Sequence, residues 1–365
     1  MPLTKPSARQ PLAKGSAPSG SAAIARSGAS PVTLKQVAAA AGVHFSTVSR
    51  ALNPATRTLV KPPIAARIFE TARRLGYRTN SLASSLRTRR SYVVGVVVPD
   101  IASLLFPPIL EGIEEALLAQ GYMTIVANTA NDPDRHRRIL SGMIERQVDG
   151  LIIATATLRD PILDEWLEGR APIVLINRTD ESGRAPAVIS DDVRGIGLAV
   201  KHLVDLGHSR IAHIAGPRGL STGALRLRGF QLTCAELSIP KAKQVVVQAA
   251  AFSRDAGRIA CLELLGKNAG VSAIVAANDL LALGCYDALA EQGLSCPADM
   301  SITGYNDAPF MDLVRPPLTT IRIKQRDMGS EAARILLTRM AGEAAVADIL
   351  LRPELISRQS TAPRP

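Results

Sequence analysis

Residues 41–53, AGVHFSTVSRALN, decide how this chain is interpreted, because they have the form of a tight turn followed by a short helix. Upstream, Thr33 and Gln36 have the spacing of a capping box that starts a helix. Apolar residues then recur at helical spacing, and Gly42 permits the sharp turn that follows. The pattern predicts a helix-turn-helix, with an ordinary pair of surface helices as the alternative.

The second helix of this pair has one apolar and one polar face. Its valine, alanine and leucine side chains can pack inward, which leaves Phe45, Ser46, Ser49 and Arg50 on the outer face in two pairs four residues apart. Short polar side chains and one arginine suit the major groove of DNA, where arginine forms two hydrogen bonds with guanine. The outer face therefore predicts contact with DNA bases.

The residues from Val32 to Asn53 closely resemble the headpiece of the lactose-repressor/galactose-repressor (LacI/GalR) family of bacterial transcriptional regulators. The resemblance continues, with gaps, to about residue 361. It implies that Phe45, Ser46 and Arg50 read bases and that Thr47, Ser49 and Asn53 touch phosphates. The complete set of DNA-binding candidates is Thr33, His44, Phe45, Ser46, Thr47, Ser49, Arg50, Asn53, Ala83 and Leu86.

His44 departs from the family pattern, which usually has a serine that caps the recognition helix at this position. A histidine here either contacts a phosphate or is simply exposed, and the sequence does not choose between the two.

The charge is concentrated near the N-terminus. Residues 1–91 contain 15 Lys and Arg and one acid, a charge of +14, whereas the rest has 28 basic and 31 acidic residues, a charge of −3; together they give the net +11. A basic segment on a near-neutral body is typical of a tethered nucleic-acid-binding module. Basic charge also suits membrane surfaces, but no apolar amphipathic helix accompanies it here.

The first 31 residues are rich in Ser, Ala, Pro and Gly and contain no acid, so we expect a disordered basic tail. The composition also resembles that of organelle transit peptides, and an overextended start is a third interpretation. No apolar run is long enough to span a membrane. The four cysteines are spaced 27, 24 and 11 residues apart, without a CxxC pair, which predicts reduced thiols of a cytosolic protein and no metal site.

A third helix is expected from Pro62 to Leu75, which completes a headpiece over residues 32–79. The following small, polar stretch, residues 80–91, is too short to be a stable helix alone and reads as a linker. The resemblance implies that it is a hinge that becomes helical on the operator. Ala83 and Leu86 would then enter the minor groove, where Leu86 would wedge apart a central base step.

The body, residues 92–365, alternates apolar runs with helical periods, which predicts an α/β fold with parallel sheets covered on both faces. Helices are expected at about 107–120, 133–147, 192–206, 223–237, 253–266 and 278–291. Strands are expected at Val93–Val98, Met123–Asn128, Leu151–Thr155, Ile173–Asn177, Ile211–Ala215, Val245–Gln248, Ala273–Ala277 and Ile302–Tyr305.

The family resemblance implies that this body is a periplasmic-binding-protein-like core that binds an effector and dimerises. Its first subdomain would span about 92–190 plus 321–351, and its second about 191–320 plus the C-terminal end. Ligands of open α/β sheets sit at the carboxyl ends of the strands. The effector-binding candidates there are Phe106, Arg178, Thr222, Arg226, Phe252, Asn278 and Asn306.

Arg226 matches the family's effector-gripping arginine. Two departures from the family pattern affect the expected pocket: residues 103–106, SLLF, replace a common Asn-Pro-Phe-Phe type of segment, and Asn306 stands where many sugar-binding relatives have Asp. An amide keeps one acceptor but loses the charge. Without a carboxylate at position 306, Arg226, and Arg178 as a second candidate, would be less neutralised. We therefore hypothesise that the cleft holds an acidic effector more easily.

Enzymatic interpretations are weak, because the chain has no GxxxxGK[ST] loop, GxSxG elbow or HExxH motif, and no cofactor is expected. A secreted solute-binding protein would fit the body alone, but the headpiece and the lack of a signal sequence argue against it. The sequence predicts a cytoplasmic bacterial repressor that binds a pseudo-palindromic operator as a homodimer and responds to a small polar metabolite, a sugar or sugar acid.

Overall fold

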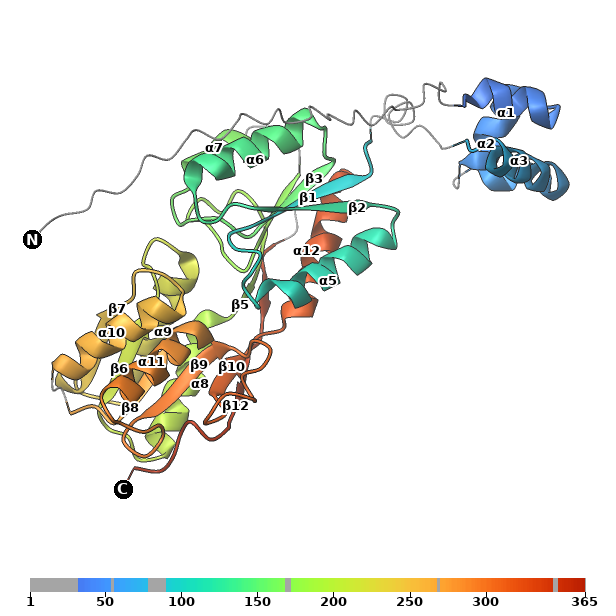
Figure 1. Ribbon diagram of the computed structural model, residues 1–365. Coiled ribbons are helices and arrows are strands. Elements are labelled where there is room, and N and C mark those ends of the chain that lie inside the picture. Colours follow the sequence, from blue (N-terminus) through green and yellow to red (C-terminus); the bar gives the residue numbers. More distant parts are fainter. Residues whose placement is uncertain are drawn as a thin grey trace, which may run out of the picture. The chain divides into compact units, whose positions relative to one another are not determined.

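The computed structural model describes residues 32–53, 56–77, 90–167, 172–267, 270–343 and 347–364. They belong to two compact units, a headpiece within residues 1–80 and a core within residues 81–365 (Figure 1). Within the described part of the chain, no helix is long and apolar enough to cross a membrane.

The headpiece consists of α1 (Leu34–Ala41), α2 (Phe45–Leu52), the short 3-10 helix η1 (Arg57–Leu59) and α3 (Pro62–Arg74). The capping box at the start of α1 is confirmed: the Thr33 backbone N–H donates to the Gln36 side-chain oxygen at 2.7 Å, and the Thr33 hydroxyl accepts from the Gln36 backbone N–H at 3.4 Å. Gly42 ends α1 at a φ of 61°, a left-handed conformation that glycine adopts without strain. The turn between α1 and α2 therefore follows from local sequence.

The headpiece has its own hydrophobic core, to which all three α-helices contribute. Val37 of α1, Val48 of α2 and Ile68 of α3 are completely buried and lie at its centre. Because these positions repeat at helical spacing, each helix turns one apolar face inward and leaves its polar face to solvent. This packing fixes which side chains of α2 are presented outward.

The core contains two six-stranded sheets. The first has the order β11-β5-β4-β3-β1-β2, with β1 (Val93–Val98), β2 (Met123–Asn128), β3 (Gly150–Ile153), β4 (Ile173–Ile176), β5 (Ala187–Ser190) and β11 (Ile349–Leu351). The second has the order β12-β10-β9-β8-β6-β7, with β6 (Ile211–Ala215), β7 (Gln244–Gln248), β8 (Ala273–Ala276), β9 (Ser301–Asn306), β10 (Thr319–Arg322) and β12 (Glu354–Ile356). Every pairing is parallel except that of β10 with β12.

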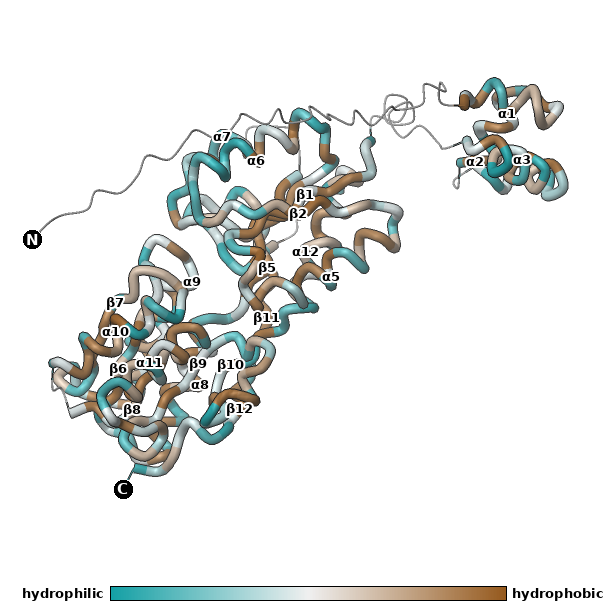
Figure 2. The backbone as a smooth tube through the Cα atoms, in the orientation of Figure 1, coloured by the Kyte–Doolittle hydropathy of each residue, from teal (hydrophilic) through white to brown (hydrophobic). Residues whose placement is uncertain are grey.

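Helices cover both faces of the first sheet. Val96 of β1 packs in the cluster that contains α5 (Phe106–Leu118) and α12 (Gln325–Met340). Val97, the next residue, packs on the opposite side with α6 (Pro133–Glu145) and α7 (Pro161–Leu167). Because both faces are buried, the central strands are hydrophobic throughout rather than alternating, as Figure 2 shows for this sheet.

The second sheet is built in the same way. Ala273 of β8 packs in the cluster that contains α8 (Asp192–Asp205) and α9 (Ser221–Glu236), whereas the adjacent Ile274 packs with α10 (Arg254–Gly266) and α11 (Asp279–Glu291). A second 3-10 helix, η2 (Lys241–Lys243), precedes β7. The expected α/β fold class, with a helical headpiece and two parallel sheets, is confirmed.

The chain passes between the two sheets three times: from β5 to α8, from β10 to α12, and from β11 to β12 (Figure 1). Strand β10 pairs with β9 and so lies wholly in the second sheet, and α12 then packs against α5 and the first sheet. One hydrophobic cluster continues from the first sheet into the second and contains both Val96 of β1 and Ala273 of β8.

Candidate functional site

The surface that the sequence predicts to contact DNA is the outer face of α2. Val48 and Ala51 face the headpiece core, whereas Arg50 is exposed and Phe45 keeps half of its surface, 50%, exposed to solvent. Ser46, Thr47 and Ser49 are partly exposed between them. This face therefore offers a ligand both an exposed apolar side chain and a cationic one.

His44 caps α2. Its Nδ1 accepts a hydrogen bond from the Ser46 backbone N–H at 3.4 Å and lies 2.7 Å from the Ser46 hydroxyl. The His44 and Phe45 rings are 4.5 Å apart and tilted by 51°. The imidazole therefore performs the capping that the sequence interpretation did not assign to it, while it remains exposed.

The C-terminal end of α2 is held by the segment that follows it. The Thr56 hydroxyl donates to the Arg50 carbonyl oxygen at 3.1 Å, and the Arg57 Nε donates to the Ala51 carbonyl oxygen at 3.4 Å. The Arg57 guanidinium also lies 4.6 Å from the centre of the Phe69 ring on α3. Both ends of α2 are thus fixed by side chains. Ala83 and Leu86, the two minor-groove candidates, lie outside the described residues.

The core contains a cleft of about 1220 Å³. Residues from both sheets line it, mostly at the carboxyl ends of strands, where a ligand of an open α/β sheet is expected. The structure brings together all seven effector candidates in this cleft: Phe106, Arg178, Thr222, Arg226, Phe252, Asn278 and Asn306. Its volume slightly exceeds the roughly 300–1,000 Å³ typical of small-molecule sites.

Arg226 is buried, and two of its nitrogens donate hydrogen bonds to other groups of the protein. Its Nε donates to the Asp192 carboxylate at 2.9 Å, and its Nη1 donates to the Ala277 carbonyl oxygen at 2.7 Å. The guanidinium is stacked on the Tyr305 ring, 3.9 Å from its centre. Asp192 on α8 therefore supplies a counter-ion for Arg226, although position 306 carries an amide rather than a carboxylate.

Asp192 and Arg226 form a buried ion pair, with side chains 3% and 4% exposed. Burial raises the pKa of Asp192, and the Arg226 guanidinium opposes that rise. The Tyr305 hydroxyl also contacts the Asp192 carboxyl, and burial raises the tyrosine's pKa well above its usual range. Tyr305 therefore stays protonated and donates to this pair.

Arg178, which follows β4, has a different environment. It is 9% exposed, and its Nε is buried without a hydrogen-bond partner among the residues that the structure describes. Among the described residues, no carboxylate forms an ion pair with it. Burial, and then repulsion from the Arg226 guanidinium, lower the pKa of Arg178 to about 10, so it still carries its charge at neutral pH.

Two further polar groups of the cleft, the Thr222 hydroxyl and the Asn306 side-chain oxygen, have no hydrogen-bond partner within the described part of the chain, and both residues are almost completely buried. Asn306 ends β9 with a φ of 116°, a conformation that non-glycine residues rarely adopt. Asn278 differs from these two, because its side-chain oxygen caps α11 by accepting the Leu281 backbone N–H at 2.9 Å.

Two further titratable residues line the cleft: His136, which the sequence did not single out, and Asp279, which the sequence places beside Asn278 at the end of a strand. His136 on α6 lies 3.0 Å from the Thr155 hydroxyl. Asp279, next to Asn278, accepts hydrogen bonds from the Ala308 backbone N–H and the Thr320 hydroxyl, and burial raises its pKa to about 7. The only sequence signal for His136 is its position within a helix that packs on the sheet.

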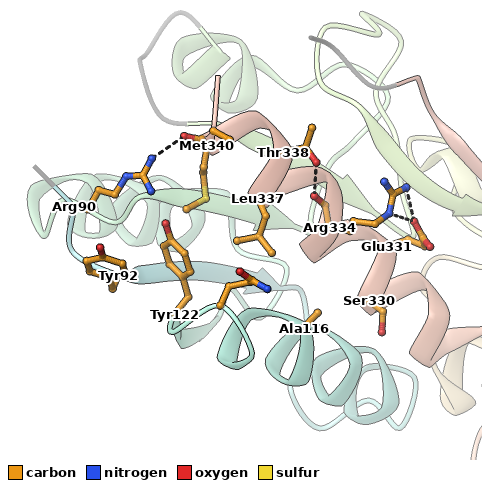
Figure 3. A pocket seen from close by; sticks show the side chains of 12 residues that line it. Arg90, Tyr92, Ala116, Tyr122, Ser330, Glu331, Arg334, Leu337, Thr338 and Met340 are labelled. Carbon is orange, nitrogen blue, oxygen red and sulfur yellow. Dashed lines mark hydrogen bonds and ion pairs between the residues drawn. The ribbon is translucent and has the colours of Figure 1, made fainter. Parts of the chain in front are cut away.

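A second hollow of about 640 Å³ lies between α5, the start of β1 and α12 (Figure 3). The Tyr92 and Tyr122 rings, 5.4 Å apart, and the Leu337 side chain form much of its wall. Arg90 donates to the Met340 carbonyl oxygen at 3.3 Å across it. Its described lining has no buried polar atom without a partner, so it lacks the chemical features of the cleft.

The described residues contain no group of three or more His, Cys, Asp or Glu that could hold a metal ion. The four cysteines are free thiols, and burial raises the pKa of Cys234 to about 11, which keeps it protonated and unreactive.

Comparison with known proteins identifies the family. Residues 33–80 match the model for bacterial regulatory proteins of the lacI family, and residues 200–361 match the periplasmic binding protein-like domain. Catabolite control protein A of Priestia megaterium is 30% identical over 332 residues, which cover 90% of this chain and 99% of that protein. The chain belongs to the lacI family of bacterial regulatory proteins.

Other relatives support the assignment of this chain to the lacI family. The HTH-type transcriptional regulator DegA of Bacillus subtilis is 32% identical, over 91% of this chain and 98% of its own. Among solved structures, the lac repressor dimer bound to operator and the anti-inducer ONPF superposes with a TM-score of 0.81, at 29% identity, covering 91% of this chain and 100% of that one. These relatives are transcriptional regulators, not enzymes.

A ribose-bound lacI-family regulator from Enterococcus faecium is 33% identical to the chain, with a TM-score of 0.67, covering 75% of this chain and all of that one. The lacI-family assignment and the α/β core thus rest on sequence and structure together, and the chain spans nearly the full length of the curated relatives it matches.

Proposed function

We propose that this chain is a homodimeric repressor that binds a pseudo-palindromic operator and is controlled by a small polar metabolite in the core cleft. One observation carries the proposal: a capped helix with an exposed arginine and a cleft with convergent, unpartnered polar groups occur in one chain. The first suits the major groove, and the second suits a hydroxylated ligand, a sugar or sugar acid. Such a regulator acts in the bacterial cytoplasm, where its DNA is.

On this proposal α2 enters the major groove. Phe45, Ser46 and Arg50 read base edges, and Arg50 forms two hydrogen bonds to a guanine. His44 contacts the DNA backbone: because its Nδ1 accepts the amide hydrogen of α2, the neutral ring carries its proton on Nε2, which can donate to a phosphate. The remaining backbone contacts come from Thr33, Thr47, Ser49 and Asn53.

We assign residues 32–79 to the headpiece, 80–91 to a hinge and 1–31 to a basic tail. In the hinge, Ala83 and Leu86 would contact the minor groove. Residues 92–365 form the effector-binding and dimerisation core, so that two headpieces are presented to the two halves of the operator.

The effector acts by changing the relative orientation of the two subdomains. Its binding groups come from both: Phe106 and Arg178 from the first, and Thr222, Phe252 and Asn306 from the second. A ligand that contacts both sides favours one closure angle, and it alters operator affinity only through its different affinities for the two states.

The test of the DNA-binding part uses the full chain and an operator selected by that chain from random duplex DNA. Arg50→Ala should reduce the preference for the selected operator over random DNA, because a bidentate base contact contributes about 1–3 kcal/mol of discrimination. The matched control is Arg73→Ala, which removes an exposed arginine from α3 rather than from α2.

Affinities are measured by fluorescence anisotropy at several salt concentrations. The control should keep the preference for the operator while both variants lose some general affinity, because each removes one positive charge. An Arg50→Ala variant with wild-type preference would contradict the assignment of α2 as the recognition helix.

A further inference from the structure

The two arginines of the cleft are not equivalent. The charge of Arg226 is balanced by Asp192 at 2.9 Å, and its plane is held against the Tyr305 ring. The guanidinium of Arg178 has neither support: among the described residues, it takes part in no ion pair, and its Nε lacks any hydrogen-bond partner. A buried, unpaired cation is unfavourable, because desolvation is not offset by an opposite charge.

The carboxylates that line the cleft are engaged elsewhere. Asp132 and Asp160 accept backbone N–H groups at the starts of α6 and α7, and Asp100 accepts the Ala102 backbone N–H. Glu181 pairs with Arg159 at 3.1 Å. Asp279 accepts from a backbone N–H and a threonine hydroxyl. None of the five balances Arg178.

The other groups without partners define the rest of the ligand. Native proteins pair nearly all buried polar atoms, so the Thr222 hydroxyl and the Asn306 side-chain oxygen, both buried in this cleft, mark positions that a ligand completes. The amide oxygen of Asn306 accepts only, so it needs a hydroxyl or N–H donor. The Arg178 guanidinium donates only, so it needs an acceptor, and its charge favours an oxyanion.

We infer that Arg178 is the anion-binding group of the cleft and that the effector is a polyhydroxylated metabolite with one acidic group, held by Arg178 at that group and by Asn306 at a hydroxyl. This inference rests on the proposed function and names the ligand class. Arg226, which the family resemblance marks as the effector-gripping arginine, keeps its charge paired with Asp192 and serves as the wall behind the ligand. An anion between the two arginines also relieves their mutual repulsion.

Thermal stability without ligand gives the first test, because it distinguishes a binding residue from a structural one. Arg178→Met replaces an unpaired buried cation by an apolar side chain of similar length, so the ligand-free protein should melt at a higher temperature than wild type. Arg194→Met is the matched control, because Arg194 is exposed on α8 and should leave the melting temperature nearly unchanged. A lower melting temperature for Arg178→Met would overturn the inference, since it would mean that the cation is stabilised by the protein itself.

Ligand binding gives the second test. The probes are pairs of an acid and its neutral parent: gluconate and glucose, galacturonate and galactose, and ribose 5-phosphate and ribose, with inorganic phosphate and acetate as simple anions. Binding is measured by calorimetry and thermal shift. We expect at least one acid or simple anion to bind wild type, its neutral parent to bind far more weakly, and Arg178→Met to lose about 10- to 100-fold in affinity, the usual effect of a charge-assisted hydrogen bond. The carboxylate and phosphate probes distinguish the two sources of the oxyanion.

Three results would overturn the inference: a neutral sugar that binds wild type and Arg178→Met equally, an acid whose affinity survives Arg178→Met, or a wild type that no acid or simple anion stabilises up to tens of millimolar. Operator affinity, measured on the same preparations, separates the two proposals. If operator selectivity persists while the acid probes fail, the ligand class is wrong and the repressor function stands. If wild type shows no operator selectivity, the function itself fails.

Discussion

Removal of the Arg226 guanidinium should destabilise the core severely. Arg226→Met leaves the Asp192 carboxylate, 3% exposed, without its counter-ion, and leaves the Ala277 carbonyl oxygen without its donor. Truncation of one partner of a buried pair costs about 3–5 kcal/mol, a large part of the roughly 5–15 kcal/mol that stabilises a typical domain. At about 2–4 °C per kcal/mol, the melting temperature should fall by roughly 10 °C.

The assays are urea unfolding and thermal melting of the full chain, each followed by the fluorescence of Trp166, the single tryptophan, and by far-UV circular dichroism. Arg226→Met/Asp192→Asn should recover much of the loss, because the second change removes the orphaned charge. The control is Arg254→Met, which breaks the exposed pair with Asp287 and should cost less than about 1 kcal/mol. If Arg226→Met costs no more than this control, or if the double variant is no more stable than the single one, the reasoning is refuted.

Two further predictions follow from histidines. His44→Ala removes the cap of α2 and should destabilise that helix by about 0.5–2 kcal/mol, which would appear as faster amide hydrogen exchange in α2 of the full chain. His44→Ser should keep the cap. Equal exchange rates in wild type and both variants would contradict this prediction. His213 is buried, and its Nδ1 donates to the Val275 carbonyl oxygen at 2.8 Å; burial lowers its pKa to about 4, from 6.5. Between pH 6.5 and 4 the unfolded chain binds a proton that the folded chain does not, so His213 reduces stability as pH falls through this window, by at most about 3 kcal/mol. The raised pKa of Asp279 changes stability with pH in the opposite direction. The measurement is therefore the difference in unfolding free energy between wild type and His213→Asn as a function of pH. A difference that does not depend on pH would exclude this role for His213.

Long apolar periodicities made most of the fold predictable. Val93–Val98, Met123–Asn128 and Ile211–Ala215 are strands with the bounds that the sequence indicated, because each is buried on both faces or bounded by clear turn residues. The other five expected strands are also present, with ends that differ by one or two residues. The six expected helices of the core are present as well, because each presents an apolar face at helical spacing to a sheet.

The sequence did not reveal β5, β10, β11 or β12. These are strands of three or four residues, such as Ile349–Leu351, whose pairing depends on a neighbour far away in the chain. So short a run carries no period that separates it from a loop, and tertiary context decides its conformation. Helices α7 and α12 were also missed, because the polar and charged residues of Gln325–Met340 obscure its apolar face.

Sequence and family resemblance placed the seven cleft candidates at one site, but not their electrostatic relations. Asp192 on α8 and Arg226 on α9 are 34 residues apart in the sequence, and no sequence motif indicates that they form a pair. Whether a guanidinium is neutralised depends on which carboxylate the fold brings within about 4 Å, so the sequence did not reveal that Asp192 is the counter-ion of Arg226. For the same reason, the sequence does not show that Arg178 lies apart from every carboxylate of the described residues.

The most direct test of the central claim measures linkage between the cleft and the DNA. The affinity of the full chain for its selected operator is titrated with and without a saturating ligand of the cleft, and the ligand's affinity is then titrated with and without operator. We predict that the two affinities change by the same factor, typically 5- to 150-fold, because coupling free energy is reciprocal. Operator affinity that is identical in the presence and absence of a saturating cleft ligand would contradict the account.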